Sequence, residues 1–249
     1  MPMKQGFVIP VYRHGKTAGP LAEKLSVFGL PVILVDDGND DENRICLEEC
    51  CAKTPGLFLV KLETNMGKGK AVTKGFEKAH ELGLTHVFQI DADGQHELEQ
   101  TAFFLEESSR HPDKVICGLP EFDDEAPRSR VIGRKISNFW AAASTLSGEL
   151  KDVLCGFRVY PLEPALTIVS NPLFPGRMGF DAEILVRLYW KKVFPLYHPI
   201  KVSYPKDGIS NFRVFRDNLQ FCWMFTRLFI GMLIRLPMLI LINIERGKK

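Results

Sequence analysis

Residues 86–96 read HVFQIDADGQH, a short and largely apolar run followed directly by two aspartates, a glycine and two polar residues. Similar runs occur at residues 6–12 (GFVIPVY), 32–37 (VILVDD), 57–63 (LFLVKLE) and 115–120 (VICGLP). Nearly continuous apolar character over a short run is typical of strands that are buried on both faces of a parallel sheet. The sequence therefore predicts strands of this kind throughout its first half.

The segments between these runs have the length and pattern of helices. They cover residues 17–28, 42–53, 70–82 and 97–110. Strands that alternate with helices form a doubly wound, mostly parallel α/β sheet, and such sheets bind ligands at the carboxyl ends of their strands. The acidic residues that end two of the runs, Asp36 and Asp37 in one and Asp91 and Asp93 in the other, are therefore predicted to share one site.

The pattern changes after residue 121. A charged loop leads to a predicted helix at 131–146, an extended stretch at 153–160, a helix at 181–190 and an extended run at 196–204. The sequence shows no clear linker and no internal repeat. We expect one α/β domain over residues 1–215, with an amphipathic, membrane-facing helical extension over residues 216–249.

The C-terminal extension is both basic and apolar. Residues 210–249 carry a net charge of +5, whereas the other 209 residues carry −3. Arg227, Arg235 and Pro237 interrupt the apolar part, and its uncharged runs are shorter than the ~20 residues that a membrane span needs. This pattern favours a helix that lies on an anionic membrane surface over nucleic-acid binding. A membrane span and a core or oligomer face are the alternatives.

The six cysteines give no sign of a metal centre. None of them has the spacing of a zinc site, and no secretory signal precedes them. We expect all six to be reduced packing residues in a cytosolic chain.

Asp91 and Asp93 lie one residue apart at the end of a predicted buried strand. Two carboxylates in this arrangement can bind one divalent cation, and oxygen ligands suit Mg²⁺ or Mn²⁺. Gln95 can add a neutral oxygen. A solvated turn is the alternative for an isolated Asp-x-Asp, but the buried strand before it favours a metal site.

Two other loops are predicted to face the same edge of the sheet. Asp37 ends a strand at a position where an acidic side chain can bind a base or a ribose, although Asp and Gly also begin ordinary turns. Residues 65–70 (NMGKGK) open a helix, and their glycines and lysines favour a diphosphate. The alternative for this loop is a solvated basic helix start.

Together these motifs resemble the family 2 glycosyltransferases of the GT-A fold. The segments that carry the resemblance are IPVY, VDDG, NMGKGKAV with KGF, DADGQH, ISNF after Arg134, and GFR after Asp152. The resemblance is strongest with the dolichol-phosphate mannose synthase-like group, which includes bacterial polyprenyl-phosphate glycosyltransferases. It covers residues 6–215 and is firmest over residues 6–160.

The resemblance implies a nucleotide-sugar donor, a divalent metal and a lipid-linked acceptor. Asp91, Asp93 and Gln95 would bind the metal and the donor diphosphate. The other donor-binding residues that it implies are Pro10, Tyr12, Asp37 and Lys68.

An acceptor phosphate would be held by basic and hydroxyl side chains. The resemblance assigns this role to Arg130, Arg134, Ser137 and Arg158. A surface helix with scattered charge is the alternative for Arg130 and Arg134. The sequence departs from the family at Arg13-His14, where Asn-Glu is usual, and at Asn39, where Ser is usual. These departures leave the sugar and the base of the donor open.

We expect direct displacement at the anomeric carbon, with inversion, and a catalytic role for Asp93 through the metal. A phosphate acceptor is already anionic, whereas a hydroxyl acceptor needs a base within hydrogen-bond reach. Asp152, Asp181 and Glu183 are the predicted bases, although Asp181 and Glu183 also suit a helix start.

Other functional classes fit the motifs less well. A phosphohydrolase would place its nucleophilic aspartate after the first strand, and a nucleotidyltransferase would need a glycine-rich first loop that contains Arg. A non-catalytic nucleotide-binding membrane scaffold would have little use for the acidic strand ends. We therefore expect a peripheral enzyme at the cytoplasmic face of a membrane, with polyprenyl phosphate as acceptor and a hydroxyl-bearing glycolipid or acyl lipid as runner-up. We expect no nucleic-acid partner, and a homo-oligomer stays open.

Overall fold

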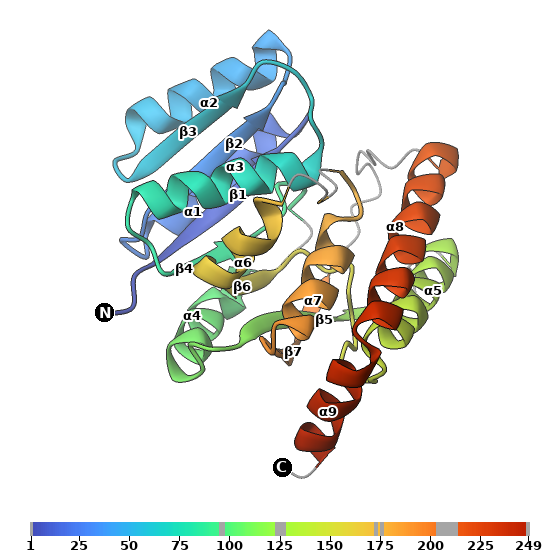
Figure 1. The fold of residues 1–249 in the computed structure, drawn as a ribbon. Coiled ribbons are helices and arrows are strands. Elements are labelled where there is room, and N and C mark those ends of the chain that lie inside the picture. Colours follow the sequence, from blue (N-terminus) through green and yellow to red (C-terminus); the bar gives the residue numbers. More distant parts are fainter. Residues whose placement is uncertain are drawn as a thin grey trace.

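The protein is described from a computed structural model, which covers residues 2–94, 98–122, 128–171, 174, 177–202 and 214–247. For residues 122, 128–130, 214 and 215 it describes the backbone alone. Helices flank a central sheet on both faces, and a pair of C-terminal helices lies along one side of the molecule (Figure 1). This arrangement is the doubly wound α/β architecture that the alternation of strands and helices predicts.

The sheet has seven described strands in the order β3-β2-β1-β4-β6-β5-β7. β6 runs antiparallel to its neighbours β4 and β5, and all other neighbours are parallel. The strands are β1 (Gln5–Val11), β2 (Val32–Asp37), β3 (Leu57–Leu62), β4 (His86–Gln89), β5 (Val115–Phe122), β6 (Arg158–Pro161) and β7 (Pro195–Val202). The strand order reverses at β1, so the crevice outside the carboxyl ends of β1 and β4 is the expected ligand site.

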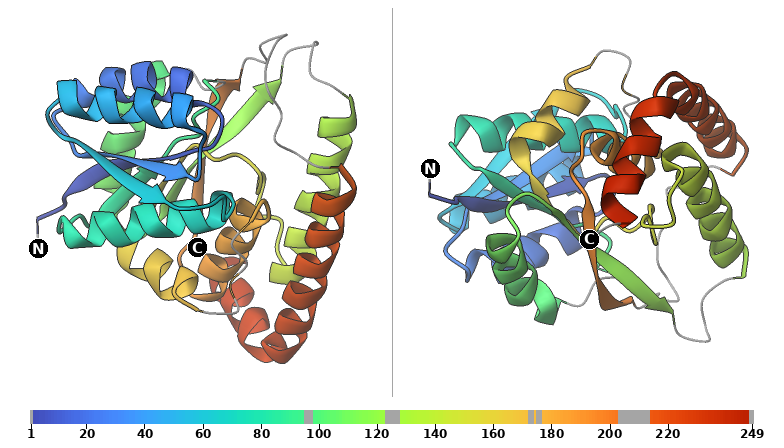
Figure 2. Two further views of the ribbon diagram at one scale, coloured as in Figure 1. Left: turned by 90° about the horizontal axis from the view of Figure 1, so that it is seen from above. Right: turned by 60° about the horizontal axis from the view of Figure 1, so that its bottom comes forward.

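The helices form a layer on each face of this sheet. They are α1 (Gly15–Ser26), α2 (Asp41–Lys53), α3 (Lys68–Glu81), α4 (Thr101–Arg110) after the 3₁₀ turn η1 (Leu98–Gln100), α5 (Arg128–Thr145), α6 (Leu162–Val169), α7 (Phe180–Trp190), α8 (Val214–Ile234) and α9 (Leu236–Gly247). Helices α1, α2 and α4 cover one face, and α3, α6 and α7 cover the other (Figure 2).

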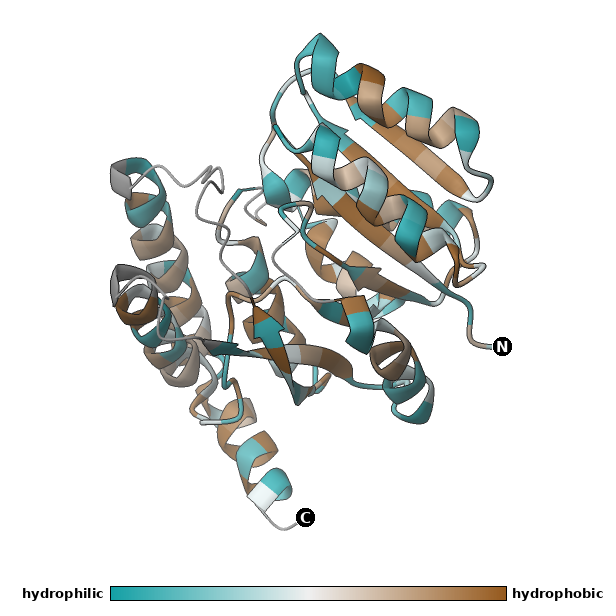
Figure 3. Cartoon of the chain, turned by 180° about the vertical axis from the view of Figure 1, so that it is seen from behind, coloured by the Kyte–Doolittle hydropathy of each residue, from teal (hydrophilic) through white to brown (hydrophobic). Residues whose placement is uncertain are grey.

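Two hydrophobic cores result from the alternation of side chains along the strands. Phe7 and Ile9 of β1 point to the α1 side, and Val8 between them points to the α3 side. The strands are the most continuously hydrophobic part of the fold (Figure 3). The core on the α3 side extends into the C-terminal helices, where Leu228 and Leu239 are fully buried.

The predicted elements are confirmed in kind, with small shifts at their ends. All five early strands form, and the extended stretches predicted at 153–160 and 196–204 become the shorter β6 and the strand β7. Helix α6 was not predicted, because its eight residues, LEPALTIV, are too few to show a helical period.

The C-terminal helices meet at a sharp bend of 82°. Pro237 explains the break, because a proline lacks the N–H that would continue the ladder of α8. Among the described residues, no single helix is long and apolar enough to span a membrane, although the bent pair passes that test by length and composition.

The outward sides of α5, α8 and α9 carry an unusual share of exposed apolar side chains. These three helices hold fifteen of the twenty-one exposed large hydrophobic residues in the described part of the chain. Trp140 of α5 and Phe229 of α8 touch across this surface, with ring centroids 6.2 Å apart. We call it the outer apolar face; its members are Ile132, Ile136, Phe139, Trp140, Leu219, Trp223, Phe229, Ile230, Leu233, Ile234, Leu236, Met238, Ile240, Leu241 and Ile244.

Candidate active site at the carboxyl edge of the sheet

The carboxyl edge of β1, β2 and β4 gathers most of the predicted site. The strands are parallel neighbours, with Val11 of β1 opposite Asp36 of β2 and Val8 opposite Gln89 of β4. Helices α3 and α7 begin at this edge. The first turn of a helix carries N–H groups without partners in the helix and a partial positive charge, so this edge favours an anionic ligand.

Asp37, predicted to bind the donor, holds the loop before α3. Its carboxylate accepts hydrogen bonds from the backbone N–H of Met66 at 2.7 Å, the N–H of Gly67 at 2.9 Å and the side-chain amide of Asn65 at 3.0 Å. Only 2% of Asp37 is exposed. Burial raises the pKa of Asp37, and the two backbone donors oppose that shift. In this conformation Asp37 holds the loop that leads into α3.

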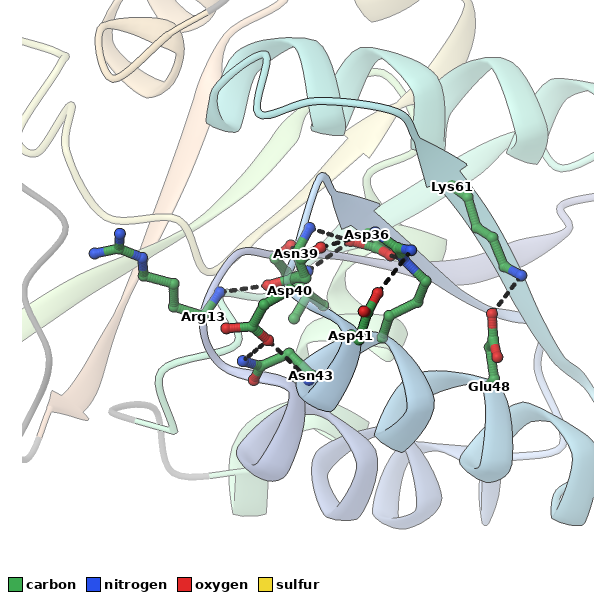
Figure 4. Close-up of polar contacts among 10 residues, drawn as sticks. Arg13, Asp36, Asn39, Asp40, Asp41, Asn43, Glu48 and Lys61 are labelled. Atoms are coloured by element: carbon green, nitrogen blue, oxygen red, sulfur yellow. Dashed lines mark hydrogen bonds and ion pairs between the residues drawn. The ribbon is translucent and has the colours of Figure 1, made fainter.

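Asp36 points to the opposite face of the sheet, as the alternation along a strand requires. One of its oxygens accepts hydrogen bonds from the backbone N–H and side-chain amide of Asn39 at 2.8 and 2.7 Å, and Arg44 of α2 approaches the other at 3.5 Å (Figure 4). Asp36 is fully buried. It therefore braces the turn after β2.

Lys68, the first residue of α3, lies between two carboxylates. Its ammonium group is 2.7 Å from the nearer oxygen of Asp91 and 2.6 Å from Asp181. Burial lowers the pKa of Lys68, but Asp181 and Asp91 together outweigh burial and raise it, so the side chain is charged. The predicted basic loop therefore directs a lysine to Asp91 of the predicted metal site.

Asp181 is fixed from three sides. Gln89 of β4 donates to its second carboxylate oxygen at 2.9 Å, and Arg158 of β6 donates to its backbone carbonyl at 2.6 Å. With Lys68, these contacts hold the start of α7 beside Asp91. Of the three predicted bases, Asp181 is therefore the one that Lys68 joins to Asp91 of the predicted metal site.

Asp91 and Asp93 are both half-buried, as residues that line a crevice should be. The loop before β6 packs closely on Asp91, because a Cβ added to Gly156 would lie only 2.4 Å from a carboxylate oxygen of Asp91. Ala92 between them is buried, and its carbonyl accepts a hydrogen bond from Thr17 of α1 at 2.7 Å. Gln95 lies outside the described residues.

Pro10 and Tyr12 lie one residue apart at the end of β1, on the same side as Val8 and the α3 layer, and both are half-buried. The structure therefore places them on the same side of the sheet as Asp37. The guanidinium of Arg13 lies 5.2 Å from the ring centre of Tyr12.

The residues predicted to bind an acceptor phosphate are not all accessible. Arg134 of α5 forms an ion pair with Asp152, and Ser137, one turn further along α5, is 7% exposed. Arg158 is fully buried beneath the start of α7, so a lipid phosphate cannot reach it in this conformation. The side chain of Arg130 lies outside the described part of the structure.

Asp152 and Glu183 are engaged elsewhere in the fold. Asp152 also accepts hydrogen bonds from the backbone N–H groups of Leu154 and Cys155 at 3.0 and 2.8 Å. Glu183 is fully buried and ion-paired with Arg187 at 2.6 Å and with Arg227 of α8 at 2.8 Å. Burial raises the pKa of Glu183, although both arginines oppose that shift. Neither placement supports a role as general base.

The chemistry of the crevice fits a divalent cation held by few protein ligands. Asp91 and Asp93 supply the oxygen donors that Mg²⁺ and Mn²⁺ prefer. Among the described residues, no group of three or more His, Cys, Asp or Glu side chains is arranged to hold a metal. A cation bound here would therefore take its other ligands from water and from a diphosphate, which is common for Mg²⁺.

Sequence reasoning missed several residues that shape this site. Gln89 is a polar residue in a fully buried strand, and that exception was a readable signal. Gly156 was noted only as part of a motif, and its contact with Asp91 required the structure. Arg177, which lies close enough to Asp37 to lower its pKa, gave no signal in the sequence.

Comparison with known proteins is consistent with this geometry. A sequence model described as Glycosyl transferase family 2 matches residues 7–164. A dolichyl-phosphate beta-glucosyltransferase of Dictyostelium discoideum is 29% identical over 168 residues, which are 64% of this chain and 50% of that protein. An undecaprenyl-phosphate mannosyltransferase of Micrococcus luteus is 27% identical over 196 residues, 72% of this chain and 75% of that protein. The chain thus spans only half the length of the first relative.

The fold is also shared with solved structures. Glucosyl-3-phosphoglycerate synthase from Mycobacterium tuberculosis, solved with Mn²⁺, UDP-glucose and phosphoglyceric acid, matches with a TM-score of 0.64 and 16% identity over 93% of this chain and 79% of that one. At this identity the likeness shows the fold alone. Because the family model also matches more than half of the chain, the chain belongs to glycosyltransferase family 2 and is a glycosyltransferase of the GT-A fold.

Proposed function

We propose that this glycosyltransferase moves a sugar, with inversion, from a UDP- or GDP-sugar to polyprenyl phosphate at the cytoplasmic face of a membrane. The names of the two relatives support a lipid phosphate as acceptor, because one is a dolichyl-phosphate and the other an undecaprenyl-phosphate glycosyltransferase. Their partial coverage and modest identity make this a proposal for the present chain.

One structural observation carries the proposal. The loop from Asp152 to Gly156 joins the donor crevice to α5, since its first residue is paired with Arg134 and its last packs on Asp91. Helix α5 also contributes to the outer apolar face. A lipid lying along that face would bring its phosphate to Arg134 of α5, beside the loop that reaches Asp91.

In the proposed reaction, Asp91 and Asp93 would hold Mg²⁺ or Mn²⁺, and a metal bound there would supply the positive charge that stabilises a nucleoside diphosphate leaving group. In the described structure Lys68 pairs with Asp91 and Asp181; a metal bound to Asp91 would displace it there, and its ammonium would still add to the positive charge of the site. The first turns of α3 and α7 add their dipoles in the same direction. The chain thus contributes mainly positioning and electrostatic stabilisation.

A phosphate acceptor agrees with the placement of the predicted bases. A phosphate oxygen is anionic at neutral pH and needs no strong base. Asp152 and Glu183 are bound by arginines, and Asp181 is bound by Lys68 and Gln89. A hydroxyl acceptor is the second candidate, and the proximity of Asp181 to Asp91 is the observation that favours it.

Release of nucleoside diphosphate by the purified protein tests the proposal. We would supply a panel of UDP- and GDP-sugars with Mg²⁺ or Mn²⁺, with and without a short polyprenyl phosphate, and with EDTA as a control. We expect release that requires both the metal and the polyprenyl phosphate. Donor binding without polyprenyl-dependent release would replace the phosphate acceptor with a hydroxyl acceptor.

The outer apolar face is proposed to bind the membrane surface. Large exposed apolar patches mark protein or membrane contacts, and most of this one lies on the two helices of the basic C-terminal segment, with α5 beside them. Deleting α8 and α9 would be a poor test, because Leu228 and Leu239 belong to the core.

A surface variant tests membrane binding without removing core residues. Changing Ile136, Phe139, Trp223 and Ile230 to serine should reduce flotation with anionic vesicles. Changing Val27, Ile45 and Phe103, which are exposed elsewhere, serves as the matched control and should leave flotation unchanged. Equal flotation of both variants, with nucleotide binding retained, would exclude the outer apolar face as the membrane contact.

A further inference from the structure

Arg13, directly after β1, has a backbone conformation that side chains seldom adopt. Its φ of 62° lies in the left-handed region, which is unfavourable for a residue other than glycine. Residues held in such conformations cluster at functional sites, where the surrounding structure enforces them. Hydrogen bonds from neighbouring loops should therefore hold the backbone of Arg13 in this conformation.

Two asparagines hold the loop between β1 and α1. Asn39, after β2, accepts a hydrogen bond from the backbone N–H of Arg13 at 2.6 Å and donates to the carbonyl of Val11 at 2.9 Å. Asn43, in the first turn of α2, accepts from the N–H of Gly15 at 2.8 Å. The loop is thus fixed on both sides of Arg13.

Asn39 is itself held in place by a buried carboxylate. It is 4% exposed, and its side-chain amide donates to Asp36 at 2.7 Å. Asp36 thus fixes Asn39, which in turn binds the backbone of Arg13.

The side chain of Arg13 remains available to a ligand. It is exposed, and Figure 4 shows it pointing away from the network of Asp36 and Asn39. Within the described ranges no ion pair involves Arg13. Asp40, an acidic neighbour, uses its carboxylate on the backbone and side-chain N–H groups of Asn43 at 3.0 and 2.7 Å.

We infer that Arg13 binds the nucleotide half of the donor and that Asn39 positions it for this task. Arg13 lies beside Tyr12 at the end of β1, where the strand order reverses and a nucleotide is expected. A guanidinium group binds phosphate oxygens and the carbonyl oxygens of a base edge through paired N–H groups. The inference rests on the proposed function, because it requires a nucleotide-sugar donor.

Replacing Arg13 with glycine measures the contribution of its side chain to nucleotide binding. Glycine adopts a positive φ freely and keeps the N–H that Asn39 binds, so Arg13→Gly should fold with an unchanged or higher Tm. Calorimetry with UDP and GDP should show that the variant binds the preferred nucleotide at least about tenfold more weakly than the wild-type protein does. Lys16→Gln, which removes an exposed cation of α1 paired with Glu42, is the matched control and should bind normally.

A comparison of ligands locates the contact within the nucleotide. A loss confined to the diphosphate assigns the guanidinium to the β-phosphate. An equal loss for the monophosphate assigns it to the α-phosphate, the ribose or the base, and both results support the inference. Wild-type binding with an unchanged Arg13→Gly variant would overturn it. Failure of the wild-type protein to bind either nucleotide would instead overturn the proposed function.

The positioning role of Asn39 needs a test that general destabilisation cannot mimic. Asn39→Ser should weaken nucleotide binding severalfold in the wild-type background and have no further effect in the Arg13→Gly background. Equal losses in both backgrounds would show that Asn39 acts independently of Arg13. A tenfold loss of affinity in Arg13→Gly leaves nucleotide binding that calorimetry can measure. The effect of Asn39→Ser can therefore be determined in both proteins.

Discussion

Strands β2 and β4 both deliver a pair of aspartates to the carboxyl edge of the sheet, Asp36 and Asp37 from one and Asp91 and Asp93 from the other. At β2 the two carboxylates are almost fully buried and bind N–H groups of the protein itself. At β4 the carboxylates are half-buried, and Asp91 is ion-paired with the ammonium group of Lys68. Lys68 thus occupies the position that we propose for the metal ion.

This difference shows how similar motifs divide into two tasks. A carboxylate surrounded by fixed N–H groups is part of the scaffold, because removing it leaves buried donors without partners. A half-buried carboxylate paired with a cation can exchange that partner for a ligand. We therefore expect the end of β2 to support the site and the end of β4 to bind the ligand on which the proposed chemistry depends.

The largest expected effect is on turnover, at the end of β4. Asp93→Asn should lower kcat by more than about a hundredfold, because the proposed metal loses a charged oxygen ligand. The fold should persist, since Asp93 is only half-buried. Initial rates of nucleoside diphosphate release and circular dichroism measure the two properties. Asp41→Asn, a highly exposed acid of α2, is the control, and turnover retained by Asp93→Asn would reject its assignment as a metal ligand.

At the end of β2 the main effect should be on stability. Asp37→Asn replaces one of the oxygens that bind Met66 and Gly67, and we expect a loss of about 1–3 kcal/mol in the free energy of unfolding. Donor affinity should fall as well, because this loop leads into Lys68. Urea unfolding and nucleotide titration provide the measurements. Full stability combined with lost donor binding would place Asp37 in direct contact with the donor. The aspartates of β2 and β4 would then both bind ligand, and the proposed difference between the two strands would be wrong.

A smaller effect should follow from disturbing Asp91 indirectly. Gly156→Ala places a Cβ 2.4 Å from an oxygen of Asp91, so that carboxylate must move. A displacement near 1 Å can lower kcat by up to about a hundredfold, and we expect a fall of about tenfold. Gly148→Ala is the matched control, because a Cβ there meets nothing within 4 Å. Equal rates for both variants would show that the exact position of Asp91 matters little.

The sequence was sufficient to predict the sheet and the residues at its edge. Short apolar runs that end in Asp91 or in Asp37 have a plain physical meaning, and the enzyme class that they indicated is confirmed by the family match, so the non-catalytic scaffold is wrong. The contacts of these residues could not be predicted in this way. The distinction between Asp37 and Asp91 depends on their contacts with the loop that contains Met66 and Lys68, which are 29 and 23 residues away in the chain, and no local pattern encodes it.

The same limit explains the predictions that remain unsupported. Glu183 and Arg158 have residue types suited to a site, but both are buried inside the fold. Glu183 is ion-paired with Arg227 of α8, and Arg158 donates a hydrogen bond to the backbone carbonyl of Asp181 in α7. The C-terminal segment was predicted to lie at a membrane interface, with a core face as an alternative. The structure shows that it contributes Leu228 to the core on one side and exposes Trp223 on another, and membrane binding stays a prediction.

The smallest expected effect lies at the amino end of β4, away from the crevice. His86 is 7% exposed, and one ring nitrogen lies 2.9 Å from the carbonyl of Pro112. Burial lowers its pKa below the unfolded value, and the contact with Pro112 only partly opposes this. Unfolding therefore takes up a proton, so stability should decline as the pH falls below about 6.5. His86→Gln should flatten this decline in urea unfolding series and leave kcat unchanged. A changed kcat would mean that both ends of β4 serve the reaction, which would undo the division between scaffold and site.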